Sequence, residues 1–193
     1  VRDRVYSALT REYGNKKEVV QHFYHKDTSV PIWAIFEVLT LGEFGNFYSC
    51  LSYGVRREVS IKLGFHQPSD SDAFLTKKII FAIKELRNAV AHNDVIFDTR
   101  FSRSSIDKSL SSSLEIVTGI KSITFKSITD YIILVVYLLK CFGVPKGDMR
   151  RFVAEFQDNI ETLRKQIPTS LFARIVLTDT RPKLKSLQEY IRK

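Results

Sequence analysis

The chain has 193 residues and a formal net charge of +9 at neutral pH, with 30 Lys and Arg against 21 Asp and Glu. This length can bury one hydrophobic core, and a hydrophobic content of 44% argues against extensive disorder. The positive charge favours an acidic partner such as nucleic acid or an anionic membrane surface. The alternative is a basic surface that only keeps the protein soluble.

Apolar runs and cysteines point to a cytoplasmic protein. The longest apolar run, residues 131–139, is far shorter than the roughly 20 residues that cross a bilayer, so we expect no membrane segment. Residues 1–13 are charged throughout, unlike a secretory signal peptide. Cys50 and Cys141 have no neighbours at metal-ligand spacing, and we interpret both as small core residues. We expect no metal and no cofactor.

Short helices are predicted before residue 64. The spacing of apolar residues indicates helices at residues 2–13, 16–25 and 55–63. A further helix is expected to begin at Pro31 and to end at Gly42. In the helix that starts at Pro31, four apolar residues form a stripe that we expect to face the core. These are Ile32, Ile35, Phe36 and Leu39.

A longer helix is predicted at residues 73–92, with Ser71 or Asp72 as its cap. Its apolar stripe consists of Ile79, Ile83, Leu86 and Val90. A Ser-rich loop follows at about residues 101–113.

The sequence of the C-terminal half predicts further helices. Residues 116–123 are β-branched and indicate either a short strand or a turn. Apolar spacing then predicts helices at 124–142, 149–165 and 183–193, with a helical turn within 168–177. We therefore predict an all-α fold with one domain over residues 1–193.

Polar residues gather at the end of the helix predicted at 73–92. Glu85, Asn88 and His92 are three and four residues apart, so they share one helical face. Arg87 is five residues before His92, which places the two about 140° apart on an ideal helix. They can converge if the Arg87 side chain swings round, if the helix distorts near Asn93, or if a second copy of the helix faces the first.

Two segments carry a resemblance to a known family. Arg87-Asn88 followed by His92 resembles the Arg-x(4–6)-His motif of the HEPN superfamily, whose catalytic members cleave RNA without metal. Residues 30–44, with Pro31, Trp33, Glu37, Thr40 and Gly42, resemble the PxW…E…TxG signature of bacterial abortive-infection (Abi) proteins, a HEPN branch. The resemblance covers residues 1–100, and the remainder only by helical character.

The resemblance implies a HEPN-like helical bundle with additional C-terminal helices. It also implies a homodimer in which Arg87, Asn88 and His92 line a shared catalytic cleft near the two-fold axis. An imidazole can act as acid or base near neutral pH, and a guanidinium offers paired donors to phosphate oxygens. Glu85 is a supporting residue. Glu37 either braces Arg87 as a buried carboxylate or is an ordinary exposed helical glutamate.

Basic residues near the motif are candidates for binding RNA. They are Lys84, Arg100, Arg103, Arg56 and Arg57. The function expected from the resemblance is phage defence by a metal-independent endoribonuclease, with an RNA or protein antitoxin as a further partner. The alternatives are a non-cleaving module that binds a structured or small regulatory RNA, and a helical domain that binds only proteins.

Overall fold

The structure is a computed structural model that describes residues 2–65, 67–97, 99 and 106–193. Within these residues it contains eleven α-helices and no strand, which confirms the all-α prediction. The helices are α1 (Arg2–Gly14), α2 (Glu18–His25), α3 (Ile32–Val38), α4 (Leu41–Ser49), α5 (Tyr53–Lys62), α6 (Leu75–Ala91), α7 (Lys108–Thr118), α8 (Ile128–Cys141), α9 (Lys146–Gln166), α10 (Thr169–Ile175) and α11 (Thr180–Arg192).

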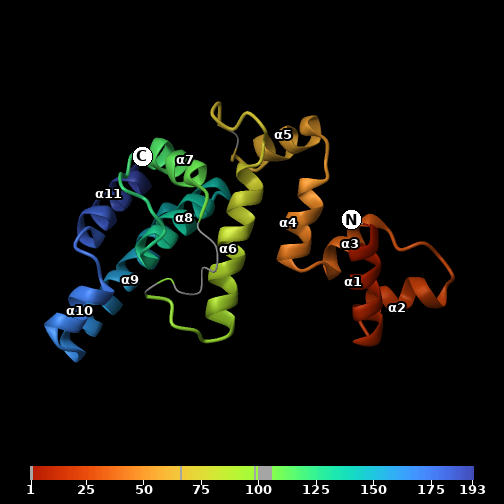
Figure 1. Cartoon of the computed structure of the whole chain (residues 1–193), viewed down its shortest axis with the longest axis horizontal. Helices are drawn as coiled ribbons and strands as arrows, with labels where there is room; N and C mark the ends of the chain where they lie inside the picture. Colours follow the sequence, from red (N-terminus) through yellow and green to blue (C-terminus); the bar gives the residue numbers. More distant parts are fainter. Residues whose placement is uncertain (1, 66, 98, 100–105) are drawn as a thin grey trace.

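Helix α6 lies at the centre of the molecule (Figure 1). Helices α7 and α8 pack against one side of it, and α9 and α11 pack against α8. On the other side α4 packs along α6, and α1, α2 and α3 lie beyond α4. The end of α6 that carries the sequence motif points away from α5.

The hydrophobic core is formed by residues from Phe65 onward. Its largest fully buried side chains come from α6, α7, α8, α9 and α11, among them Leu75, Leu110, Tyr131 and Leu187. Helices α1, α2 and α3 bury only small side chains, which are Ala8, Val20, Ala34 and Val38. The first helices are therefore held less by apolar burial than the C-terminal ones.

The predicted end of the third helix at Gly42 is wrong. Helix α3 ends at Val38, and Thr40 caps a new helix that contains Gly42 in its first turn. The predicted core-facing stripe is also wrong, because Ile32 is 62% and Phe36 41% exposed. Helix α3 instead buries Ala34 and Val38, since α1 packs on that side of it.

Other predictions need smaller corrections. Cys50 is exposed rather than part of the core, and Val90 at the end of its apolar stripe is 60% exposed. Residues 101–105 of the Ser-rich segment lie outside the described residues, and from Lys108 the segment is helical. Residues 119–127 form an irregular connection with a bend at 125–127 and no strand.

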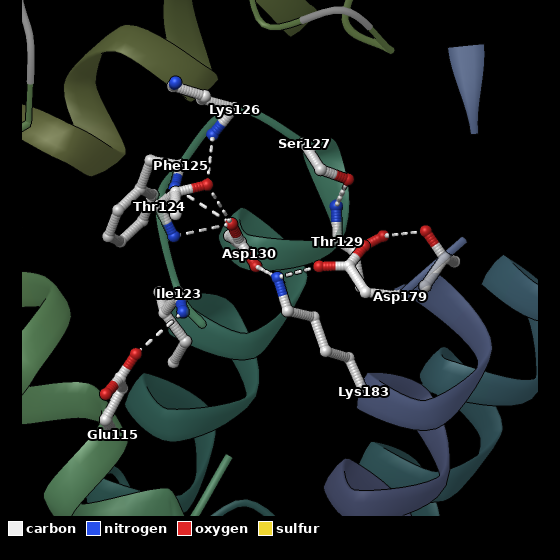
Figure 2. A network of polar contacts seen from close by, with 11 residues as sticks. Glu115, Ile123, Thr124, Phe125, Lys126, Ser127, Thr129, Asp130, Asp179 and Lys183 are labelled. Atoms are coloured by element: carbon white, nitrogen blue, oxygen red, sulfur yellow. Dashed lines mark hydrogen bonds and ion pairs between the residues drawn. The ribbon is translucent and has the colours of Figure 1, made fainter. Parts of the chain in front are cut away.

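A buried ion pair fixes this connection and α11 to the start of α8 (Figure 2). Asp130 Oδ2 accepts hydrogen bonds from the backbone N–H groups of Thr124 and Phe125, each at 2.9 Å. Asp130 Oδ1 lies 2.7 Å from Lys183 Nζ, which is also 2.8 Å from Asp179 Oδ2. Burial alone lowers the pKa of Lys183, but the hydrogen bonds that Lys183 donates to Asp130 and Asp179, together with the two negative charges, outweigh it and raise that pKa.

Candidate functional site

The end of α6 has a left-handed turn that exposes the motif. Asn93 has a φ of +56°, and its N–H donates to the Val90 carbonyl at 3.2 Å. The N–H of Asp94 donates to the Ala89 carbonyl at 2.9 Å. This pair of bonds is the Schellman arrangement, in which asparagine is one of the few residues that tolerate the left-handed position. It places His92 at the C-cap, directly after the last helical residue Ala91 and exposed to solvent.

The three residues predicted to be catalytic lie within the last two turns of α6. Arg87 Nη1 donates to Asn88 Oδ1 at 3.0 Å, so the structure joins these two side chains directly. Asn88 is half-buried, while Arg87 and His92 are exposed. Among the described residues, no hydrogen bond orients the His92 imidazole within one chain. Within the described residues of a single chain, the site is therefore only partly organised.

The two predicted supporting glutamates have other partners. Glu85 pairs with its neighbour Lys84, with 2.8 Å between Oε1 and Nζ. The Glu37 side chain is 49% exposed and lies 3.5 Å from Lys17 Nζ. The interpretation of Glu37 as a buried carboxylate bracing Arg87 is therefore wrong for the single chain, and the exposed alternative is what the structure has.

The predicted RNA-binding residues divide into three groups. Arg56 is used internally, because its guanidinium donates to the carbonyls of Leu51 and Asp72 and lies 4.1 Å from the ring centroid of Phe74. Arg57 is exposed on α5, and Lys84 is half-buried on α6. Arg100 and Arg103 lie outside the described residues.

A cationic and aromatic stripe on α6 was not predicted. Lys77, Phe81, Lys84, Asn88 and His92 recur at intervals of three and four, so they follow one helical face. Lys77 Nζ lies 5.9 Å and Lys84 Nζ 5.2 Å from the ring centroid of Phe81. The same spacing is present in the sequence, on the side of the helix opposite the apolar stripe of Ile79, Ile83, Leu86 and Val90.

Close packing of α4 covers part of this face. A Cβ atom on Gly45 would lie 2.8 Å from Phe81 Cε2, and one on Gly42 would lie 3.3 Å from Lys84 Cδ. Position 42 faces the later part of α6 and position 45 the earlier part, so the two helices are antiparallel. The α4 contact ends near Lys84, and Asn88 and His92 lie one and two turns beyond it.

In the described part of the chain, no three His, Cys, Asp or Glu side chains are grouped to hold a metal ion. No described helix combines the length and apolar character needed to cross a membrane.

Comparison with known proteins gives one match. The model of the family of Abi-like proteins matches residues 2–98, just over half of the chain. The chain belongs to the Abi-like protein family. Searches of curated proteins and of solved structures found no match. The part of this Abi-like protein that matches its family runs from α1 through α6 and contains the motif at the end of α6.

The segment that carried the family resemblance sets how α4 begins. Thr40 Oγ1 accepts from the Glu43 N–H at 3.2 Å, and Glu43 Oε2 accepts from the Thr40 N–H at 2.8 Å, which is a reciprocal capping box. Arg11 of α1 also donates to both Glu43 carboxylate oxygens, at 3.0 and 3.3 Å. The hydrogen bonds from Arg11 lower the pKa of Glu43 from 4.5 to about 2. In this Abi-like protein, the Thr40–Gly45 segment therefore positions α4 on α6 and ties α1 to it.

Proposed function

We propose that this Abi-like protein is an RNA-binding phage-defence protein and a metal-independent endoribonuclease of HEPN type. The observation that carries the proposal is the grouping of exposed Arg87, half-buried Asn88 and exposed His92 at the C-terminal end of α6. Family membership supports a role in abortive infection. The net charge of +9 supports a polyanionic substrate.

The three side chains match the needs of RNA cleavage by an internal nucleophile. The ribose 2′-oxygen loses its proton and attacks the adjacent phosphorus, while the 5′-oxygen leaves and takes up a proton. The products are a 2′,3′-cyclic phosphate and a 5′-hydroxyl, so atoms and charge balance without a metal. His92 is the proposed acid or base, and Arg87 the group that stabilises the phosphorane. Asn88, already bonded to Arg87, positions that guanidinium.

Two protomers are proposed to complete the cleft. Arg87 and His92 point about 140° apart on one helix, so one chain does not direct both at the same phosphate. Val90 and Val95, on either side of His92, are 60% and 62% exposed. Apolar side chains exposed at this end of α6 supply a surface that a second copy would cover. We therefore place the motif at or near a two-fold axis.

Cleavage tests the proposal directly. His92→Ala should lower the rate of RNA cleavage about 10²- to 10⁴-fold, because it removes the proton-transfer group. Because His92 is exposed, circular dichroism and sedimentation should be unchanged in this variant. The products from the unmodified protein should end in cyclic phosphate. Undiminished cleavage by His92→Ala would remove His92 from the mechanism.

Mixing two inactive variants tests the shared cleft. Arg87→Ala and His92→Ala proteins are each expected to be inactive alone. Exchange of protomers would create one cleft that takes Arg87 from one chain and His92 from the other. Mixing should therefore restore measurable cleavage, whereas continued inactivity of a mixture with proven exchange would mean that both groups act within one chain.

A non-cleaving RNA-binding module is the second candidate. It is favoured by the lack, among the described residues, of a hydrogen bond that orients His92, since catalytic bases are commonly held by a third group. It would retain intact RNA in a salt-sensitive manner and yield no cyclic-phosphate ends. If RNA is not retained even at low salt, both RNA functions are excluded.

A further inference from the structure

A cavity of about 300 Å³ lies where α1, α4 and α6 meet. It is separate from the three motif residues. The residues that line it are Arg4, Val5, Leu39, Glu43, Asn46, Phe47, Ser49, Cys50 and Lys77. This volume is at the lower end of the range for small-ligand sites, so it suits a compact group rather than a large planar ligand.

The charge of the cavity is positive. Glu43 is the one carboxylate among the lining residues, and it is already bound to Arg11 and to the Thr40 N–H. Within the described part of the chain, neither Arg4 nor Lys77 forms an ion pair. The two lining cations are therefore not neutralised, and the cavity is suited to an anion.

Aromatic rings hold Lys77 without removing its charge. Its Nζ lies 5.5 Å from the ring centroid of Phe74 and 5.9 Å from that of Phe81. A cation over an aromatic face keeps its N–H donors available, unlike a cation paired with a carboxylate. The Asn46 side chain adds a neutral amide to the same wall.

The cavity and the motif lie at opposite ends of one face of α6. Lys77 and His92 are 15 positions apart on the same helical face, which corresponds to about 22 Å at 1.5 Å per residue. Lys84 and Asn88 lie between them on that face. Between the cavity and the motif α4 packs against Phe81 and Lys84, so the two are separate points of contact for one strand rather than one groove.

We infer that this cavity binds a backbone phosphate of single-stranded RNA, about 22 Å along α6 from the phosphate presented to His92. This inference rests on the proposed function and adds to it a second anchoring point. The anchor would increase affinity for strands long enough to reach both points. It would carry no preference for base sequence, because phosphate contacts do not read bases.

Charge-neutralising variants test the anchor in the His92→Ala background, which is expected to bind RNA without cleaving it. Arg4→Gln and Lys77→Gln should each weaken binding of a labelled single-stranded RNA on the order of fivefold at 0.1 M salt. Each should also lower the slope of log affinity against log salt by about one. Lys77→Arg, which keeps the charge, should bind like the parent, and so should Lys185→Gln, an exposed neutralisation on α11.

Alkylation of Cys50 provides a local measurement that needs no substitution in the cavity. Cys50 is exposed and lines the cavity, whereas Cys141 is distant in sequence and half-buried on α8, and serves as the internal reference. Saturating RNA should slow alkylation of Cys50 relative to Cys141, as measured by peptide mass spectrometry. Inorganic phosphate at the same phosphate concentration should protect Cys50 much less, because it lacks the anchor at the motif.

The outcomes separate the anchor from the proposed function. If the parent retains RNA, but Arg4→Gln and Lys77→Gln bind it equally well, the anchor is excluded and the proposed function stands. Unprotected Cys50 at saturating RNA, or equal protection by inorganic phosphate, also excludes the anchor. If the parent does not retain RNA at low salt, both inferences fail. Thermal melting of Arg4→Gln, on an exposed position of α1, ensures that weak binding is not the result of unfolding.

Discussion

Glu43 shows how one side chain serves two elements. Its carboxylate caps α4 through the Thr40 N–H and accepts two hydrogen bonds from Arg11 of α1. Because Arg11 lowers the pKa of Glu43 to about 2, the folded state binds a proton here less readily than the unfolded chain. Its contribution to stability is complete above about pH 4.5 and is lost as the pH falls toward 2.

Glu43→Gln should separate the charge from the cap, since glutamine also completes capping boxes. We expect a loss of about 0.2–1 kcal/mol at pH 7, the range of exposed ion pairs, because the Arg11 side chain is 40% exposed. The difference from the unmodified protein should shrink between pH 4.5 and 2, as followed by urea unfolding at each pH. A difference that is constant over this range would show that the charge is not responsible.

Helix α4 depends on a glycine to pack closely against α6. Gly45 is buried, and a Cβ there would lie 2.8 Å from Phe81 and 3.2 Å from Ile80. Gly54, inside α5, has no atom within 4 Å of an added Cβ. Gly45 lies in the middle of α4 and Gly54 in the exposed first turn of α5, so the pair compares a glycine with close neighbours to one with free space.

Gly45→Ala should lower the free energy of unfolding by about 1–3 kcal/mol, because overpacking displaces the Phe81 ring or α4 itself. Gly54→Ala should be neutral or raise it by up to about 1 kcal/mol, since alanine is the better helix former. Urea unfolding measures both. Equal stability of the two variants would mean that α4 moves away from α6 without cost.

Over the whole molecule, the Asp130–Lys183 pair joins the C-terminal helix to the core. Lys183 is 5% exposed and Asp130 fully buried, and the pair also holds the connection that enters α8. Lys183→Met should cost about 3–5 kcal/mol, since it leaves a buried carboxylate unpaired. Lys185→Met, exposed on the same helix, should change stability by less than about 0.5 kcal/mol. Similar thermal melting of the two variants would show that the pair is not needed for stability.

Sequence periodicity predicted the helical class and most helices well, because the 3.6-residue repeat is a local property. Periodicity failed where the packing of neighbouring residues and helices determines the local structure. Thr40 and Glu43 begin a new helix at a place where Gly42 alone suggested an end. Ile32 and Phe36 were assigned to the core because their spacing is helical, but spacing cannot say which face a neighbouring helix covers.

The amino-acid sequence alone specifies the all-α class, the positive charge and the grouping of Arg87, Asn88 and His92 at one helix end. These follow from composition and from the fixed geometry of a helix. The tertiary structure is needed to show that Glu37 pairs with Lys17, that Arg56 is used internally and that Arg4 and Lys77 line one cavity. Such contacts join residues distant in the chain, and they depend on how α1, α4 and α6 pack, which no local pattern specifies.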